Sequence, residues 1–305
     1  MAGAKDIKNR IVSVKNTRKI TRTMEMVATA KSKRMSNRVN AARPYSLKVG
    51  EIMRLLGGAG DSVDSPLLRK PEHLKKVALL TITANRGLCG GYNSNTLRLA
   101  RETYEKYKSE GVEVVNYVIG KKGRAFFKFN RIPFEQDPPF RVDIDDLFTY
   151  EDSEAISEYF MDLFAQGEID RLETISMVYH SSARQTPEKT LILPVNREEA
   201  ETETGKKERD CGKDGEPCFE ANVIYEPSPN LIMETLLPLI VKTAIYRALL
   251  EAVATEQIFR RIAMKNATDS AGEMIKILTM TYNRKRQAAI TQEISEIVAG
   301  ADSVG

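Results

Sequence analysis

The residues best placed to do chemistry lie in a glycine-rich loop, Ala84–Asn93, which follows an apolar run. A loop of this kind between a strand and a helix can hold a phosphate group, because the start of a helix presents unpaired backbone N–H groups. The loop matches neither G-x-G-x-x-G nor G-x-x-x-x-G-K-[ST], and its cysteine, Cys89, has no histidine nearby in sequence to act as a base. We therefore interpret the loop as a structural turn.

The other residues able to catalyse a reaction or bind a metal are scattered along the chain. The two histidines, His73 and His180, are isolated, and three cysteines are too few for a disulfide scaffold or a zinc site of ordinary spacing. The acidic run Asp143, Asp145 and Asp146 is typical of a solvated loop. The sequence thus predicts no catalytic residue, no metal site and no cofactor.

Two cysteines, Cys211 and Cys218, flank a turn within a charged segment, residues 196–220. They could close a small exposed disulfide that is readily reduced. Cytoplasmic proteins seldom keep disulfides, so two plain thiols are the favoured alternative to a redox pair.

The elements that would position these residues alternate between strands and helices in the middle of the chain. Short apolar, β-branched runs predict strands at residues 77–83, 112–120, 174–180 and 190–195. The segments between them predict helices at residues 95–109, 121–130 and 153–166. This order predicts a central Rossmann-like α/β domain of three layers with a mainly parallel sheet.

Each end of the chain predicts a long helix. Residues 4–43 contain no Gly or Pro, and residues 228 to about 299 are helical in composition, with Pro44 expected to punctuate the first helix and Pro238 to bend the second. Both carry a weak apolar stripe, with a polar, small-residue seam in the first helix. In the second helix the stripe recurs at three- and four-residue steps through Ile275, Leu278, Tyr282, Ala289, Ile290, Ile294 and Ile297. Two such helices bury their apolar stripes best by packing against each other as an antiparallel coiled coil.

These elements divide the chain into four expected parts. They are an N-terminal coiled-coil helix at 1–60, an α/β foot domain at 61–195, a charged linker with the cysteine pair at 196–227, and a C-terminal coiled-coil helix at 228–305.

The net charge of +4 conceals a strong asymmetry. Residues 1–50 hold 13 Lys and Arg against two acids, a net charge of +11, and the remainder carries −7. Such a basic segment favours a negatively charged partner, which could be nucleic acid, a membrane surface or an acidic protein cavity. No aromatic residue precedes Tyr45 to stack on bases, but a nucleic-acid-binding or scaffold protein remains the alternative. No run of about 18 uncharged apolar residues and no secretory signal is present, so we expect a cytoplasmic protein without a membrane span.

Three segments resemble one known family, the γ subunit of F-type ATP synthases. They are IKNRIVSVKNTRKITRTMEMVATAKSKR at residues 7–34, RGLCGGYN at residues 86–93, and KNATDSAGEMIKILTMTYNRKRQAAITQEISEIVAGA at residues 265–301. The order and spacing of the three segments match the family along the whole chain.

The resemblance implies the central rotor shaft of an F-type ATP synthase, a subunit without a catalytic site. It would couple proton or sodium flow to ATP synthesis or hydrolysis by turning within the α3β3 ring of α and β subunits. Its other partners would be the ε subunit and the c-ring, with one copy per complex and no nucleic acid. It would lie peripherally on the cytoplasmic face of a bacterial inner (plasma) membrane.

The resemblance also implies particular contact residues. Those expected to face the catalytic β subunits are Met24, Arg260, Arg286, Gln287 and Thr291.

Other positions concern the foot and the departures from the family pattern. Tyr225 and Glu226 belong to a stretch that resembles the family's foot segment, which lies near the c-ring. The segment with Cys211 and Cys218 lies near the place where photosynthetic γ subunits hold a regulatory dithiol, although its spacing differs and the insertion is shorter. The bulky pair Ile258–Phe259 stands where the family usually has small residues, so the packing at this point should differ from that of the family.

Overall fold

The computed structural model describes residues 4–57, 65–69, 71, 73–181, 184–195 and 229–302. The two longest elements are the terminal helices α1 (Ala4–Gly57) and α6 (Pro229–Asp302). The described residues form two compact units. We call residues 4–30 and 260–302 the helical unit, and the described residues between 31 and 259 the packed unit.

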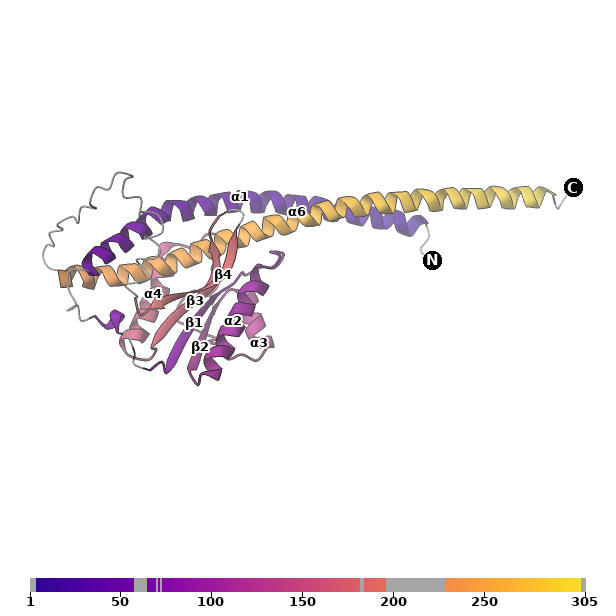
Figure 1. Cartoon of the computed structure of the whole chain (residues 1–305). Coiled ribbons are helices and arrows are strands. Elements are labelled where there is room, and N and C mark those ends of the chain that lie inside the picture. Colours follow the sequence, from indigo (N-terminus) through magenta and orange to yellow (C-terminus); the bar gives the residue numbers. More distant parts are fainter. Residues whose placement is uncertain are drawn as a thin grey trace, which may run out of the picture. The chain divides into compact units, whose positions relative to one another are not determined.

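The packed unit contains a four-stranded sheet with the strand order β2-β1-β3-β4 (Figure 1). The strands are β1 (Lys76–Ile82), β2 (Glu113–Ile119), β3 (Arg171–Tyr179) and β4 (Gln185–Leu193). Strand β1 pairs in parallel with β2 and β3, whereas β4 pairs antiparallel with β3. The predicted mainly parallel sheet is therefore confirmed, and its last strand begins earlier than the predicted 190–195.

Helices cover both faces of this sheet. On one face lie α2 (Tyr92–Ser109) and α3 (Lys121–Phe129), and on the other lies α4 (Tyr150–Ala165), with the short 3₁₀ helix η1 (Pro66–Leu68) beside it (Figure 1). Because both faces are covered, the side chains of β1 are buried along most of its length, as parallel sheets require.

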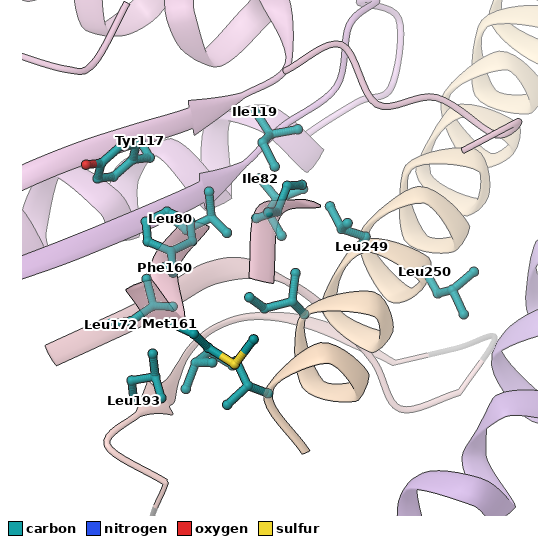
Figure 2. Packing of buried hydrophobic residues seen from close by; sticks show 14 of the residues in the cluster. Leu80, Ile82, Tyr117, Ile119, Phe160, Met161, Leu172, Leu193, Leu249 and Leu250 are labelled. Carbon is teal, nitrogen blue, oxygen red and sulfur yellow. The ribbon is translucent and has the colours of Figure 1, made fainter. Parts of the chain in front are cut away.

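The larger core joins the sheet to the long helices. Leu80 and Ile82 of β1 point toward Phe160 of α4 and Leu249 of α6, as Figure 2 shows. Phe160 is fully buried. Burial of a Leu, Ile or Phe side chain contributes roughly 1.5–3 kcal/mol, so this cluster accounts for much of the stability of the packed unit.

The sequence predicted the long helices, but the structure differs from the prediction at their prolines. Helix α4 begins with a capping box between Thr149 and Asp152. Helix α1 does not stop at Pro44, and α6 remains helical through Pro238. A proline inside a helix costs about 3 kcal/mol. In α1 this cost is offset because Met35, Val39 and Val49, on both sides of the exposed Pro44, are buried in the same core.

An acidic loop contacts α1 within the packed unit through Asp146, which corrects the interpretation of that residue as merely solvated, whereas the side chains of Asp143 and Asp145 are 45% and 47% exposed. Asp146 accepts hydrogen bonds from Lys31 Nζ at 3.0 Å and Arg34 Nη2 at 2.6 Å, and only 12% of its side chain is exposed. Partial burial raises the pKa of this carboxyl. The hydrogen bond and charge of Lys31, with the charge of Arg34, outweigh that effect and hold the pKa below its usual value.

Candidate protein-binding surface

The glycine-rich loop after β1 is a tight turn held partly by hydrogen bonds between its own residues. Asn93 accepts a hydrogen bond from the Ala84 N–H at 3.0 Å, and its Nδ2 donates to the buried Cys89 Sγ at 3.2 Å. Leu88 has a φ of 63° and Gly90 a φ of 54°, so the loop bends sharply before α2 begins. The interpretation of a structural turn fits this geometry, and α2 starts three residues earlier than predicted.

The crevice beside this loop is filled by side chains. In open α/β sheets ligands bind beyond the carboxyl ends of the strands, where successive connections leave in opposite directions. At this point Ala84, Cys89, Tyr92 and Met177 form a buried cluster with Phe259 of α6 packed against it. The Tyr92 and Phe259 rings meet edge to face at 6.2 Å between centroids. The bulky residue that departs from the family pattern therefore packs within the fold.

Within the described residues, we find no group of three or more His, Cys, Asp or Glu side chains that could hold a metal ion. None of the described helices has a stretch long and apolar enough to cross a membrane.

In the helical unit, α1 and α6 meet along one narrow face. Thr268 Oγ1 donates a hydrogen bond to Thr21 Oγ1 at 2.9 Å, and both side chains are buried. A Cβ atom placed on Gly272 would lie 3.6 Å from the Arg18 guanidinium. The lower-numbered residue of α1 meets the higher-numbered residue of α6, so these two contacts run antiparallel.

Side chains with reduced exposure recur at alternating three- and four-residue steps in α6, and in α1 with one seven-residue step between Val14 and Thr21. In α6 they are Met264, Thr268, Ala271, Ile275, Leu278 and Tyr282, and in α1 they are Ile7, Ile11, Val14, Thr21, Glu25 and Ala28. The predicted α6 stripe is thus confirmed as far as Tyr282.

The rest of the helical unit exposes an unusual amount of apolar surface. Every residue from Arg286 to Ala299 is exposed, including Ile290, Ile294 and Ile297 from the predicted stripe. Further exposed large apolar side chains are Val12, Ile20, Met24, Met26, Val27, Ile262, Met274, Ile277, Met280 and Val298. Exposed apolar surface on this scale marks a protein-protein or membrane contact.

A groove in this unit is lined by apolar and basic residues. It has a volume of about 390 Å³, and its apolar lining residues are Val12 and Ile275. Asn16 and four cations line the remainder, namely Lys15, Arg18, Lys19 and Arg22. Because no acidic residue lines the groove, it suits an acidic protein surface that also carries apolar side chains.

The residues predicted to contact a partner differ in their surroundings. Met24 is 41% exposed and is flanked on one helical face by exposed Ile20 and Val27. Arg260 of α6 is half-buried, whereas Arg286 and Gln287 are exposed.

At about 100° per residue, Gln287 lies on a face of α6 that is turned by about 120–140° from Ile275 and Tyr282. Thr291 shares that face, is exposed, and donates its Oγ1 hydrogen to the Gln287 carbonyl at 3.0 Å. Arg286 points about 100° away from Gln287. The side chains of Arg286 and Gln287 therefore point to different sides of α6.

The structure adds residues that the sequence analysis did not select. Ile277 and Met280 lie on the same face of α6 as Gln287, and both are exposed. Leu88, at the tip of the glycine-rich loop, is 62% exposed. Helical spacing could have grouped the first two with Gln287, but their exposure follows from where α1 covers α6.

Four predicted residues, Tyr225, Glu226, Cys211 and Cys218, lie outside the described residues.

Comparison with known proteins defines the class. The family model described as "ATP synthase" matches residues 3–304. The "ATP synthase gamma chain" of Leptospira biflexa is 50% identical over 304 residues, which cover 100% of both chains.

Two solved structures share the fold at low sequence identity. One is a chain of the Euglena gracilis mitochondrial ATP synthase, OSCP/F1/c-ring, with a TM-score of 0.64, 18% identity and coverage of 99% of this chain and 94% of that one. The other, from the rotor of the same organism's enzyme, has a TM-score of 0.59, 17% identity and coverage of 94% and 98%. From the full-length sequence match, the chain belongs to the gamma chain family of ATP synthases.

Proposed function

We propose that this chain is the central rotor shaft of a proton- or sodium-translocating ATP synthase. It transmits torque between the c-ring and the α3β3 catalytic ring and has no catalytic site of its own. The observation that carries the proposal is the exposed surface of the helical unit, which mixes apolar and cationic side chains on helices whose sequence follows the gamma chain family from end to end.

The helical unit is an antiparallel coiled coil in this proposal. The contacts of Thr21 with Thr268 and of Arg18 with Gly272 set one register along the two helices. Continued toward the start of α1, this register places residue 4 opposite residues near 285. That explains why every residue of α6 from Arg286 to Ala299 is exposed, since no residue of α1 remains to cover them.

The uncovered end of α6 and the outer face of α1 contact the β subunits. Met24, Arg260, Arg286, Gln287 and Thr291 form these contacts, together with Ile277 and Met280 on the face of Gln287. Individually weak polar contacts suit a shaft that turns, because partly exposed ion pairs contribute only about 0.2–1 kcal/mol each and can be exchanged cheaply. An asymmetric shaft that contacts three β subunits differently shifts their nucleotide affinities in turn.

The rest of the proposal concerns the foot and the linker. The domain limits are 1–60, 61–195, 196–227 and 228–305, with the α/β domain as the foot beside the ε subunit and the c-ring. Tyr225 and Glu226 lie near the c-ring, and Cys211 with Cys218 is a redox pair only if a dithiol reductant changes the ATPase rate of the complex. The complex lies on the cytoplasmic face of the bacterial inner membrane.

Affinity purification of this chain from its own cells tests the proposal. We expect an ATPase with one copy of the chain per three β subunits. Recovery of the chain without ATPase subunits, or with nucleic acid in a salt-sensitive complex, would contradict it.

A further inference from the structure

A buried carboxylate joins α6 to the sheet of the packed unit. Glu251 is only 5% exposed. Its Oε2 accepts a hydrogen bond from the backbone N–H of Tyr179, the last residue of β3, at 3.2 Å. Its Oε1 accepts one from Arg247 Nε at 2.8 Å, one helical turn earlier. Both carboxylate oxygens are therefore bonded, one of them to the end of a strand.

Most of the α6 side chains near Glu251 are apolar, and its polar neighbours on the same helical face are Arg247 and the buried Thr255. Neighbouring positions of α6 that are buried in the core include Ile245, Leu249, Leu250, Ala252, Val253 and Ala254. Apolar burial is not directional, so a helix that is apolar on most sides gains similar energy in several rotations about its axis. Lys242 of α6 forms ion pairs with Glu154 and Glu158 of α4, and Glu251 adds a directional bond to the sheet itself. The bond of Glu251 therefore favours one rotation of α6 against β3.

Stability alone gives little reason for a carboxylate at this place. Removing a charge from water is costly, and replacing buried ionic groups by apolar ones of similar volume is often neutral or stabilising. The best-attested use of a buried polar group is to fix the register of packed helices.

We propose that Glu251 is a positioning residue that fixes the rotation of α6 about its own axis against β3. This inference rests on the proposed rotor function. A turn of the α/β domain then reaches α6 without slippage between the helix and the sheet. Losing a hydrogen bond to a charged group changes the population of competing registers by about tenfold or more.

The experiment compares variants in the assembled ATP synthase, reconstituted into lipid vesicles. The ATP hydrolysis rate and the membrane potential formed by ATP-driven pumping are measured together, with an oxonol dye that responds to either proton or sodium transport. For Glu251→Leu we expect a several-fold lower potential at an equal hydrolysis rate, with the melting temperature of the complex unchanged or higher.

Two further variants make the test specific. Glu251→Gln keeps an oxygen that accepts the Tyr179 N–H, so we expect wild-type coupling. Gln257→Leu removes another buried polar side chain of α6 whose hydrogen bond goes to Glu256 of the same helix, and it should also remain coupled.

Full coupling in Glu251→Leu would overturn the inference, as would uncoupling by Gln257→Leu to the same extent. If Glu251→Leu does not assemble, loss of coupling in an assembled Glu251→Gln complex would overturn it and wild-type coupling there would support it. The proposed function fails separately, if the wild-type vesicles form no potential while hydrolysing ATP.

Discussion

The helical unit and the packed unit use the same kinds of side chain in opposite ways. In the packed unit, Leu80, Phe160 and Leu249 are fully buried in one core. In the helical unit, side chains as apolar as Ile277 and Ile297 are more than half exposed. The packed unit thus buries most of its large apolar side chains in its own core, with exceptions such as Leu88 and Phe129, whereas the helical unit leaves many of them exposed, as is typical of a protein-binding surface.

The two units also differ in the polar contacts that hold their helices. The packed unit holds its helices with charged groups that are largely buried, such as Asp146 and Glu251. The described hydrogen bond between the helices of the helical unit joins two neutral threonines. Fixed contacts within the packed unit and exchangeable contacts on the helical unit suit a foot and a shaft respectively.

The comparison predicts its largest effect for truncation of the core. Phe160→Ala should destabilise the packed unit by about 3–5 kcal/mol, because it leaves a cavity between α4 and the sheet. Thermal unfolding of the purified chain measures the loss. Ile277→Ala, which removes an apolar side chain from the exposed face of α6, should change stability by less than about 0.5 kcal/mol. An equal loss of stability in Phe160→Ala and Ile277→Ala would contradict the proposed difference between the two units.

The second prediction concerns the exposed end of α6. Replacing Arg286 and Gln287 together by Ala should lower the rotation-coupled ATPase rate of the assembled complex by about fivefold, since two partly exposed polar contacts are lost. The melting temperature should stay unchanged. Asn283→Ala, an exposed neighbour in the same helix, is the control. An unchanged ATPase rate in the double variant would remove these residues from the proposed contact.

A smaller effect tests the pairing of α1 with α6. Thr268→Val should cost about 1 kcal/mol, the net contribution of one buried hydrogen bond. The double replacement of Thr21 and Thr268 by Val should cost less than the sum of the two single replacements, because both polar partners are then absent. Thermal unfolding of the four proteins of this cycle measures the coupling. Strict additivity would argue against direct contact between the two threonines.

The smallest expected effect is the pH dependence of the contact between α1 and the acidic loop. The pKa of Asp146 is lower in the folded than in the unfolded chain, so its ion pairs stabilise the fold above the ordinary value of 3.8. That contribution is lost as the pH falls through the folded pKa. Asp146→Asn should therefore be less stable than wild type at pH 7 by about 1 kcal/mol or less. The difference in melting temperature should shrink as the pH falls below 3.8 and disappear once the pH is below the folded pKa. A difference independent of pH would point to packing instead of charge.

Much of the fold could be predicted from patterns in the chain. Period and composition identified both long helices and three of the strands, because Val77–Ile82, Val114–Ile119 and Ile175–Tyr179 are mostly apolar runs of the kind that buried parallel strands require, each with one polar residue. The first half of β4 was missed because Pro187, Glu188 and Lys189 are typical of a loop, and their place on a sheet edge is decided by pairing with β3.

The candidate surface was less predictable. Helical spacing assigns Ile275 and Ile290 to one apolar stripe, but the first is half-buried and the second exposed. The difference depends on where α1 begins relative to α6. Likewise, nothing in the local sequence distinguishes Asp146, which binds Lys31 and Arg34, from the neighbouring Asp145. Partners more than 100 residues apart are set by the tertiary fold.

Direct observation of rotation tests the rotor proposal most directly. The α3β3 ring with this chain is fixed to a surface through its β subunits, and a bead is attached to an exposed position of the packed unit, such as Lys128 on α3. We expect ATP to drive rotation of the bead in one direction, with three pauses per turn imposed by the three β subunits. A complex that hydrolyses ATP at the full rate while the bead stays still would contradict the proposal.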